Sequence, residues 1–159
     1  MSNGPILLVE DNRDDELLTL RAFKKNNIAN DVVVARDGVE ALDYLFGTSA
    51  AQGAAPKVLP QIILLDLNLP RIDGLEVLRR IRADDRTKLI AVIILTSSKE
   101  EDDIIAGYSL GANAYVRKPV DFAQFSEAVK ALGLFWLVLN EVAVKRTAPA
   151  GGGSGSDGR

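Results

Sequence analysis

Five short runs of consecutive apolar residues divide the chain, and none of them alternates with polar positions. A strand that is covered on both faces shows this continuous pattern, which is typical of a parallel sheet between two layers of helices. We therefore predict five buried parallel strands. The runs are Ile6–Val9, Val32–Ala35, Ile62–Leu65, Val92–Leu95 and Ala114–Val116.

Apolar residues at helical spacing follow every run. Side chains that recur every three or four positions share one face of a helix. Five alternations of strand and helix predict βαβ units with right-handed crossovers, and hence an α/β fold with a doubly wound (βα)5 parallel five-stranded sheet of the flavodoxin-like type. The positions that define the helices are Leu17, Leu20 and Phe23, then Val39, Leu42, Leu45 and Phe46, then Leu75, Leu78 and Ile81, then Ile104, Ile105 and Tyr108, and finally Phe122, Phe125, Val129 and Leu132.

Changes in composition along the chain set the expected domain organisation. We expect one domain over residues 4–146, with a long surface loop rich in Ala and Gly at 47–60. The segment 132–144 continues the last helix and is mostly apolar, so we treat it as a helical extension of the domain. Residues 147–159 are rich in Gly and Ser, a composition typical of a disordered tail.

The apolar extension has no polar face along its central residues, whereas a helix on the surface of a domain normally has one. It is too short to span a membrane. Either it folds back over the core, or it forms the seam of a homodimer with the fifth helix, since large exposed apolar patches mark interfaces. We favour the homodimer, with Phe135, Trp136 and Val138 in the interface.

Composition excludes several classes of function. The 159 residues include no Cys and no His, which excludes disulfides, thiolate metal sites and Ser-His or Cys-His nucleophile pairs. The formal net charge of −3 gives no sign of the basic face that nucleic-acid-binding proteins carry. Neither a signal peptide nor a membrane-spanning stretch is recognisable. We therefore expect a cytoplasmic protein with neither nucleic acid nor a membrane as its partner.

Charged and hydroxyl residues stand at the ends of four of the five runs. In a doubly wound parallel sheet these ends meet at one edge, where ligands bind. Carboxylates brought together there repel one another and favour a hard divalent cation such as Mg²⁺. A carboxylate is also a competent nucleophile for phosphoryl transfer. The residues are Glu10 and Asp11 after the first run, Asp66 after the third, Thr96 after the fourth and Lys118 shortly after the fifth.

A single Asp after a strand is usually a turn former or a helix cap, and this interpretation suits each acid taken alone. Four strand ends with complementary groups are much harder to explain in this way. Lys118 would neutralise phosphoryl oxygens, and Thr96 would donate a hydrogen bond to them. The whole set therefore predicts a site for an aspartyl phosphate on Asp66.

Five segments of the chain resemble, in order and spacing, the receiver domain of two-component response regulators. The resemblance covers roughly residues 5–138. Each segment alone is a weak signal, but the ordered set is highly specific. The segments are Leu8–Asn12, Leu65–Pro70, Asp73–Gly74, Leu95–Ser97 and Tyr115–Pro119.

The resemblance implies a phosphoryl acceptor beside a Mg²⁺ site. It makes Asp66 the phosphoacceptor and one of the groups around the metal. Asp11 resembles a direct metal ligand, and Glu10 resembles the acid that acts through a metal-bound water. Asn68 resembles the residue whose backbone carbonyl completes the site.

The same resemblance assigns the residues of a switch. Thr96 and Lys118 resemble the two residues that engage the phosphoryl group, and Tyr115 resembles the aromatic residue whose rotamer follows Thr96. From the sequence alone, the default role of a Tyr in a strand is packing in the core. The bond from Lys118 to Pro119 would be cis, which is accessible to proline.

The chain departs from the usual receiver-domain pattern at two positions, and it resembles one subgroup of the family. Leu69 stands where many members have Met, and Glu10 stands where Asp is common. The stretch after the fifth helix is too short for a DNA-binding output domain, so we expect a stand-alone regulator that acts through protein contact. The segment Glu10–Leu18 and the apolar extension resemble single-domain regulators paired with bacterial phytochrome histidine kinases. The expected partners are thus such a kinase and an unknown downstream protein.

Three rival functions compete with this reading. A phosphatase of the haloacid dehalogenase class needs a second Asp two residues after the nucleophile, where this chain has Asn68. A flavodoxin-type module needs a phosphate-binding loop after the first strand, where Glu10 and Asp11 would repel a flavin phosphate. A degenerate receiver that only binds partners would not need the acidic set and Lys118.

Overall fold

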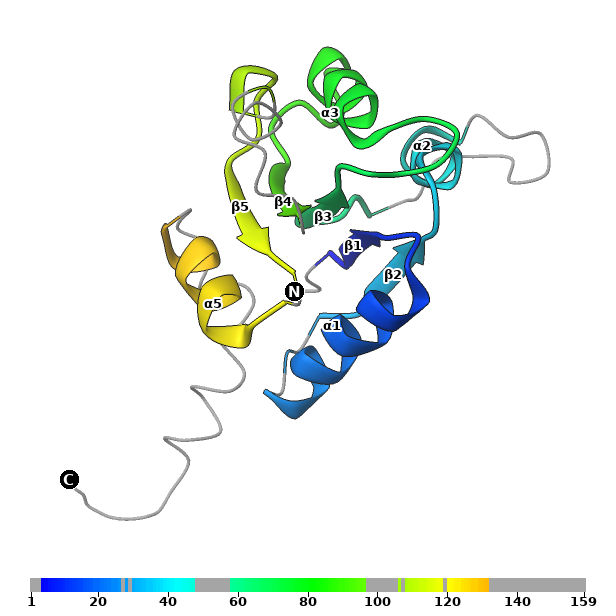
Figure 1. Cartoon of the computed structure of the whole chain (residues 1–159). Helices are drawn as coiled ribbons and strands as arrows, with labels where there is room; N and C mark the ends of the chain where they lie inside the picture. The colour runs from blue at the N-terminus through cyan, green and yellow to red at the C-terminus, as the bar shows by residue number, and fades with distance from the viewer. Residues whose placement is uncertain are drawn as a thin grey trace.

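The protein forms one parallel five-stranded sheet in the order β2-β1-β3-β4-β5 (Figure 1). The computed structural model describes residues 4–26, 28, 30–47, 58–96, 106, 108–118 and 120–131. Because β1 lies between β2 and β3, the direction of winding reverses beside it. The strands are β1 Ile6–Val9, β2 Val32–Ala35, β3 Ile62–Asp66, β4 Ala91–Thr96 and β5 Ala114–Arg117.

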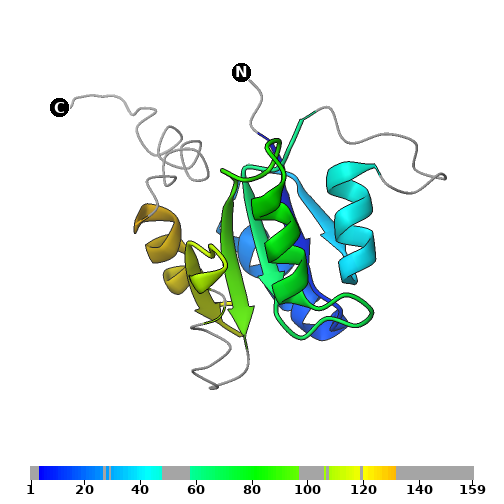
Figure 2. The ribbon, with the colours of Figure 1, turned by 90° about the horizontal axis from the view of Figure 1, so that it is seen from above.

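Helices cover both faces of the sheet. Figure 1 shows α2 (Gly38–Phe46) and α3 (Gly74–Ala83) on one side, and α1 (Arg13–Lys25) and α5 (Phe122–Ala131) on the other. Figure 2, seen from above, shows the strands running between these layers. The α/β, doubly wound, flavodoxin-like prediction is therefore confirmed.

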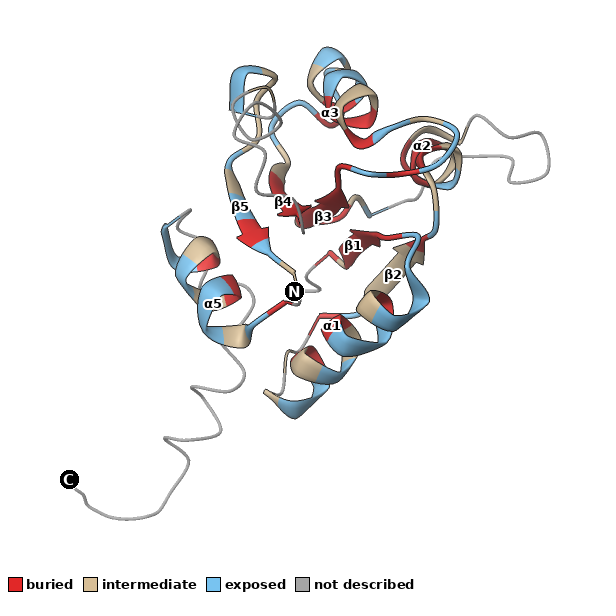
Figure 3. Cartoon of the chain, in the orientation of Figure 1, coloured by how far each residue is buried: buried red, intermediate tan, exposed pale blue. Residues whose placement is uncertain are grey.

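The continuous apolar runs form two separate cores. Successive residues of a strand point to opposite faces, so one run serves both layers. Leu7 and Leu65 belong to the cluster under α2 and α3, whereas Leu8 and Leu64 belong to the cluster under α1 and α5. All residues of β1 and β3 are buried, as the red strands in Figure 3 show. The two strands that carry Glu10 and Asp66 are thus the most rigidly packed part of the sheet.

Three helices begin with the same device on the strand-end side of the fold. The side chains of Asn12, Asp37 and Asp73 each accept a hydrogen bond from the backbone N–H three residues later. Such an N-cap satisfies a donor that the helix leaves unpaired and contributes about 1 kcal/mol. The caps fix where each helix starts, immediately beside the edge at which the expected site residues lie.

The two outer strands depart from the prediction of uniform burial. Only Val116 of β5 is buried, and Tyr115 is 41% exposed. The prediction that Tyr115 packs in the core by default is wrong, because its side chain lies exposed on β5, an edge strand of the sheet. β3 and β4 also extend through Asp66 and Thr96, which the sequence placed just beyond the strands.

Several expectations fall outside the described residues. These are the tail at 147–159, the extension at 132–144 with Phe135, Trp136 and Val138, most of the loop at 47–60, and Pro119. Of the predicted fourth helix, Ala106, Tyr108 and Ser109 are described and helical, and Ile104 and Ile105 are not described. Among the helices of the described segments, none has the length and hydrophobicity of a membrane span.

Gly74 gives a test of the contact between α3 and the end of β3. An added Cβ at Gly74 would overlap the backbone oxygen of Asp66 and lie 2.6 Å from Cα of Leu67. Alanine normally favours a helix over glycine, so a loss of stability must come from this overlap. We expect Gly74→Ala to lower the free energy of unfolding by about 2 kcal/mol in urea titrations. A variant as stable as the parent protein, or more stable, would contradict the close approach.

Candidate functional site

Three carboxylates surround one ammonium group at the strand-end edge of the sheet. Nζ of Lys118 lies 2.8 Å from Asp66 Oδ2, 3.0 Å from the Glu10 carboxylate and 3.2 Å from Asp15 Oδ2. Glu10 and Asp66 are almost fully buried, and the side chain of Lys118 is only 8% exposed. Charges buried to this degree need close partners. The four side chains therefore form one electrostatic unit, which we call the ammonium cluster.

The sheet order explains how residues so distant in sequence meet. β1 and β3 are neighbours, so Glu10 and Asp66 leave the sheet side by side. Lys118 follows β5, which lies two strands from β3, and its long side chain reaches past β4. The backbone N–H of Lys118 donates to the carbonyl oxygen of Thr96 at 2.9 Å, which fixes the start of that reach.

The pKa values of Glu10 and Lys118 are both raised, which favours the neutral form of Glu10 and the charged form of Lys118. Burial raises the pKa of Glu10 to about 7, and a hydrogen bond and repulsion from Asp66 add to the effect, although Lys118 opposes it. Burial alone would lower the pKa of Lys118, but its hydrogen bonds with Asp66 and Glu10 outweigh this and raise it. Lys118 therefore stays charged, while Glu10 is poised to take up a proton near neutrality.

The acidic groups have the arrangement of a divalent cation site. One oxygen each from Glu10, Asp11 and Asp66 lies within 4.8 Å of the others. The buried Oε1 of Glu10 lies 3.0 Å from Nζ of Lys118. Oxygen ligands without nitrogen or sulfur suit hard cations such as Mg²⁺ or Mn²⁺. The residues present thus fit a divalent metal ion beside Asp66.

The two oxygens of Asp66 have different partners. Oδ1 accepts a hydrogen bond from the backbone N–H of Asn68 at 2.9 Å, and Oδ2 accepts from Lys118. Asn68 itself is exposed in the loop between β3 and α3. The carboxylate is therefore held in one orientation, with Asn68 on one side and Lys118 on the other.

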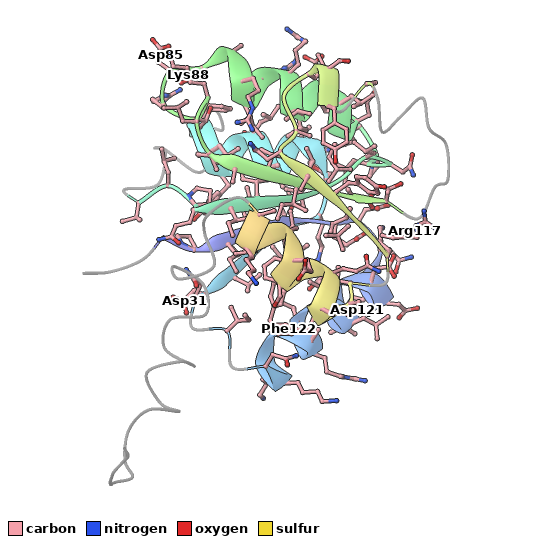
Figure 4. The ribbon with its side chains drawn as sticks, turned by 90° about the vertical axis from the view of Figure 1, so that its left-hand side faces the viewer. Asp31, Asp85, Lys88, Arg117, Asp121 and Phe122 are labelled. Carbon is pink, nitrogen blue, oxygen red and sulfur yellow. The ribbon has the colours of Figure 1, made fainter. Side chains whose placement is uncertain are left out.

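Thr96 and Tyr115 lie on the side of the site toward β4 and β5. Asp66 pairs with Leu95 in the sheet register, which places the buried Thr96 one residue beyond it, at the same edge. Tyr115 points outward, and its ring packs edge-on against Tyr108 at a centroid distance of 6.1 Å. Arg117 is exposed at the end of β5, as Figure 4 shows. Thr96 is thus near the acids, and Tyr115 is on the outer surface.

Asp15 is a member of the cluster that sequence reasoning missed. It lies in the first turn of α1, within a run of acids that is also common on solvated helix faces. The signal that could have found it is the cap: Asn12 as N-cap places Asp15 three residues into the helix, next to the end of β1. The structure brings together Glu10, Asp11 and Asp66 with Lys118 as predicted, and adds Asp15.

Comparisons with known proteins agree with this geometry. The family model of the response regulator receiver domain matches residues 6–130. The response regulator Rcp1 of Synechocystis sp. is 39% identical over 138 residues, which cover 86% of this chain and 92% of Rcp1. A crystal structure of the Mn²⁺-bound form of Rcp1 matches with a TM-score of 0.68 and 38% identity, covering 84% of this chain and 94% of that one.

Two other solved structures are similar over nearly their whole length. The bacteriophytochrome response regulator AtBRR has a TM-score of 0.78 and 51% identity, covering 88% of this chain and 99% of its own. The phosphorylated cyanobacterial phytochrome response regulator RcpA has a TM-score of 0.69 and 40% identity, covering 86% of this chain and 95% of its own. The similarity thus extends to proteins described with a bound metal and with a phosphoryl group.

The pKa of Glu10 gives the metal-free protein a characteristic pH dependence. A folded pKa of about 7 against an ordinary value of 4.5 means that the folded state binds the proton more tightly. The resulting stability is complete below about pH 4.5 and is lost as the pH rises through about 7. We expect the free energy of unfolding in EDTA to fall by about 2 kcal/mol between about pH 5 and about pH 8. Urea titrations at several pH values would measure it.

The control for this pH dependence is Glu10→Gln, which cannot titrate and should remove the fall. The pKa values of Glu76 and Asp84 are lowered to about 2 by hydrogen bonds with neighbouring arginines. The stability they contribute is present above about pH 4.5 and is lost only as the pH falls toward 2, below this window. If the free energy of unfolding fell equally with pH in the parent protein and in Glu10→Gln, Glu10 would not be the group that causes the fall.

Proposed function

The chain belongs to the family of response regulator receiver domains, the phosphoacceptor switches of two-component phosphorelays, and we propose that Asp66 is its phosphoryl acceptor. The observation that supports this assignment best is the ammonium cluster: Asp66 is buried at a strand end, with a carboxylate oxygen held 2.8 Å from Nζ of Lys118. A second acid with the same surroundings, Glu10, has a pKa that burial raises, so it tends to bind a proton. Asp66 is therefore the better nucleophile of the two.

The proposed reaction moves a phosphoryl group from the imidazole of a kinase phosphohistidine to Asp66. A carboxylate oxygen of Asp66 forms a bond to phosphorus while the phosphorus–nitrogen bond breaks, and the imidazole nitrogen keeps the electron pair and takes a proton from solvent. Lys118 offers its positive charge to the phosphoryl oxygens, and Thr96 offers a hydroxyl hydrogen bond. Water later attacks the acyl phosphate, so the domain has slow self-dephosphorylation chemistry without being a conventional enzyme.

We propose Mg²⁺ as the resident cation of the acidic site. Asp11 and Asp66 would hold it directly with the backbone carbonyl of Asn68, and Glu10 would hold one of its waters. The ion supplies compensating positive charge where an anionic phosphoryl group approaches several carboxylates. Glu10 and Asp66 are oriented for this role by the ends of β1 and β3, whichever cation is bound.

The switch in this proposal runs from Asp66 to the outer face of β5. An aspartyl phosphate carries about −1.5 to −2 charges, which draws the hydroxyl of Thr96 toward it. The space that Thr96 leaves can accept the ring of Tyr115, which is exposed in the present structure. Because the phosphoryl group interacts differently with the two arrangements, it shifts their populations and so changes the surface formed by β5 and α5.

The proposed donor is a histidine kinase of the phytochrome type, met in the cytoplasm. The support is that the relatives AtBRR and RcpA are phytochrome response regulators that this chain matches over 88% and 86% of its length. The message would then pass to a downstream protein through the surface of β5 and α5. The rival phosphatase and flavodoxin functions receive no support from these relatives.

Substitution of Asp66 tests the acceptor. Asp66→Asn should abolish the hydroxylamine-sensitive label that the parent protein acquires from acetyl phosphate or from a phosphorylated phytochrome-type kinase, because an amide cannot form the acyl phosphate. The matched control is Asp73→Asn, at an exposed N-cap that Asn serves equally well, and it should label normally. A label that persists in Asp66→Asn would place the acceptor elsewhere.

We also propose a homodimer through the region of α5 and the apolar segment that follows it. In the described part, the face of β5 and α5 carries a hollow of about 760 Å³, lined by four alanines and by the larger Tyr108, Tyr115, Arg117, Gln124 and Glu127. Figure 4 shows this face, with α5 in front and β5 behind it. Small side chains allow a second copy to approach closely. Phe135, Trp136 and Val138 would add the apolar area that a stable interface needs.

Sedimentation velocity tests the homodimer. The parent protein should sediment with twice the chain mass, and Trp136→Ser should shift it to the monomer, because one large apolar side chain would be lost from each copy. Leu89→Ser is the control, since Leu89 is an exposed apolar residue on another part of the fold. A monomeric parent protein at high concentration, with and without beryllium fluoride as phosphoryl mimic, would overturn the dimer.

A further inference from the structure

The ammonium group of Lys118 has no hydrogen-bond donor to spare. An ammonium carries three N–H donors, and the structure gives this one three carboxylate partners: Glu10, Asp15 and Asp66. The roles assigned to Glu10 and Asp66 leave Asp15 without a function. Asp15 comes from α1, whereas the other acids come from strand ends.

Asp15 is held in place from two sides. Its backbone N–H donates to Oδ1 of Asn12 at 2.9 Å, while the backbone N–H of Asn12 donates to Oε2 of Glu10 at 3.1 Å. Asn12 therefore fixes the positions of both Glu10 and Asp15 beside Lys118. On the other side, the buried Glu16 forms an ion pair of 3.1 Å with Arg36 at the end of β2. The first turn of α1 is thus fixed against the sheet.

The contacts of Lys118 change when Asp66 is phosphorylated. Once an oxygen of Asp66 is bonded to phosphorus, the negative charge moves outward to the phosphoryl oxygens, and the donor that Lys118 gave to Asp66 can turn to them. The other two donors stay on Glu10 and Asp15. If Asp15 did not hold its donor, the ammonium would be anchored by a single carboxylate at the moment the phosphoryl group arrives.

We propose that Asp15 is a positioning residue of the phosphoryl-acceptor site: together with Glu10 it holds Nζ of Lys118 beside Asp66 while the phosphoryl group is transferred. The proposal rests on the proposed function of Asp66, because it names a further residue of the same site. Asp15 touches neither phosphorus nor the leaving group in this account. It acts through Lys118 alone, over the 3.2 Å contact.

Asp14 provides a matched control for every other effect of charge. It lies one residue earlier in the first turn of α1 and is exposed, and it is not among the carboxylates around Lys118. Asp14→Asn and Asp15→Asn remove the same charge from the same end of the same helix. Both therefore change the helix-dipole interaction and the long-range repulsion of an incoming anion to a similar extent. Only Asp15→Asn weakens a contact with Lys118, because it replaces a charged acceptor of the ammonium group by a neutral amide oxygen.

The first measurement is the rate of phosphorylation of the full chain by acetyl phosphate in the presence of MgCl₂. We expect the rate of Asp15→Asn to be about fivefold below that of Asp14→Asn, the effect of losing one partly exposed charge-assisted hydrogen bond. Asp15→Glu keeps the charge and should recover most of the loss. The label acquired by Asp66→Asn gives the background to be subtracted from each rate. A rate of Asp15→Asn equal to or above that of Asp14→Asn overturns the proposal.

The second measurement needs no phosphoryl group. The ammonium protons of a buried lysine held by three carboxylates exchange slowly with water, so Lys118 should give a ¹H–¹⁵N ammonium signal that is missing in Lys118→Arg. We expect this signal to broaden or disappear in Asp15→Asn and to persist in Asp14→Asn. An unchanged signal in Asp15→Asn overturns the positioning role. If the parent protein were phosphorylated no more than Asp66→Asn, the assignment of Asp66 as the acceptor would be refuted. The ammonium signal of Lys118 would then still decide whether Asp15 holds Lys118.

Discussion

The structure depends on one electrostatic constraint: a single buried ammonium must balance the carboxylates that the ends of β1 and β3 bring together. Glu10 directly follows β1 and Asp66 ends β3, the two strands that are buried along their whole length, so the two acids are held close to each other. Two such carboxylates in a poorly solvated site repel strongly. Lys118 relieves that repulsion at 2.8 and 3.0 Å. The same repulsion favours a divalent cation beside these acids.

The need to balance these carboxylates also explains why the cation is a lysine with a long side chain that follows β5. The lysine just after β5 crosses the edge of β4 with a flexible stem and so reaches both Glu10 and Asp66. The backbone N–H of Lys118 donates to the carbonyl oxygen of Thr96, so the ends of β4 and β5 are joined beside the acids.

Much of this could be predicted from the sequence, for identifiable reasons. Runs such as Ile6–Val9 have a continuous apolar pattern because helices cover both faces, and strand ends converge in any doubly wound sheet. What the sequence did not reveal depends on position within the sheet. Tyr115 has the local pattern of a core residue, and only the strand order shows that β5 is an edge. Asp15 sits in an ordinary acidic helix turn, and only the contact of α1 with the strand ends brings it to Lys118.

The uneven packing of the sheet limits where a change at Asp66 can become visible. β1 and β3 are packed on both faces, and close-packed side chains have no alternative positions of similar energy. β5 is different, because only Val116 is buried and the ring of Tyr115 rests on the exposed Tyr108. An edge-to-face aromatic contact of this kind contributes about 0.5–1.5 kcal/mol, which a new charge at a buried site can readily outweigh. The packed centre of the sheet thus holds Glu10 and Asp66 in place, whereas β5 presents the exposed ring of Tyr115 at the edge of the sheet.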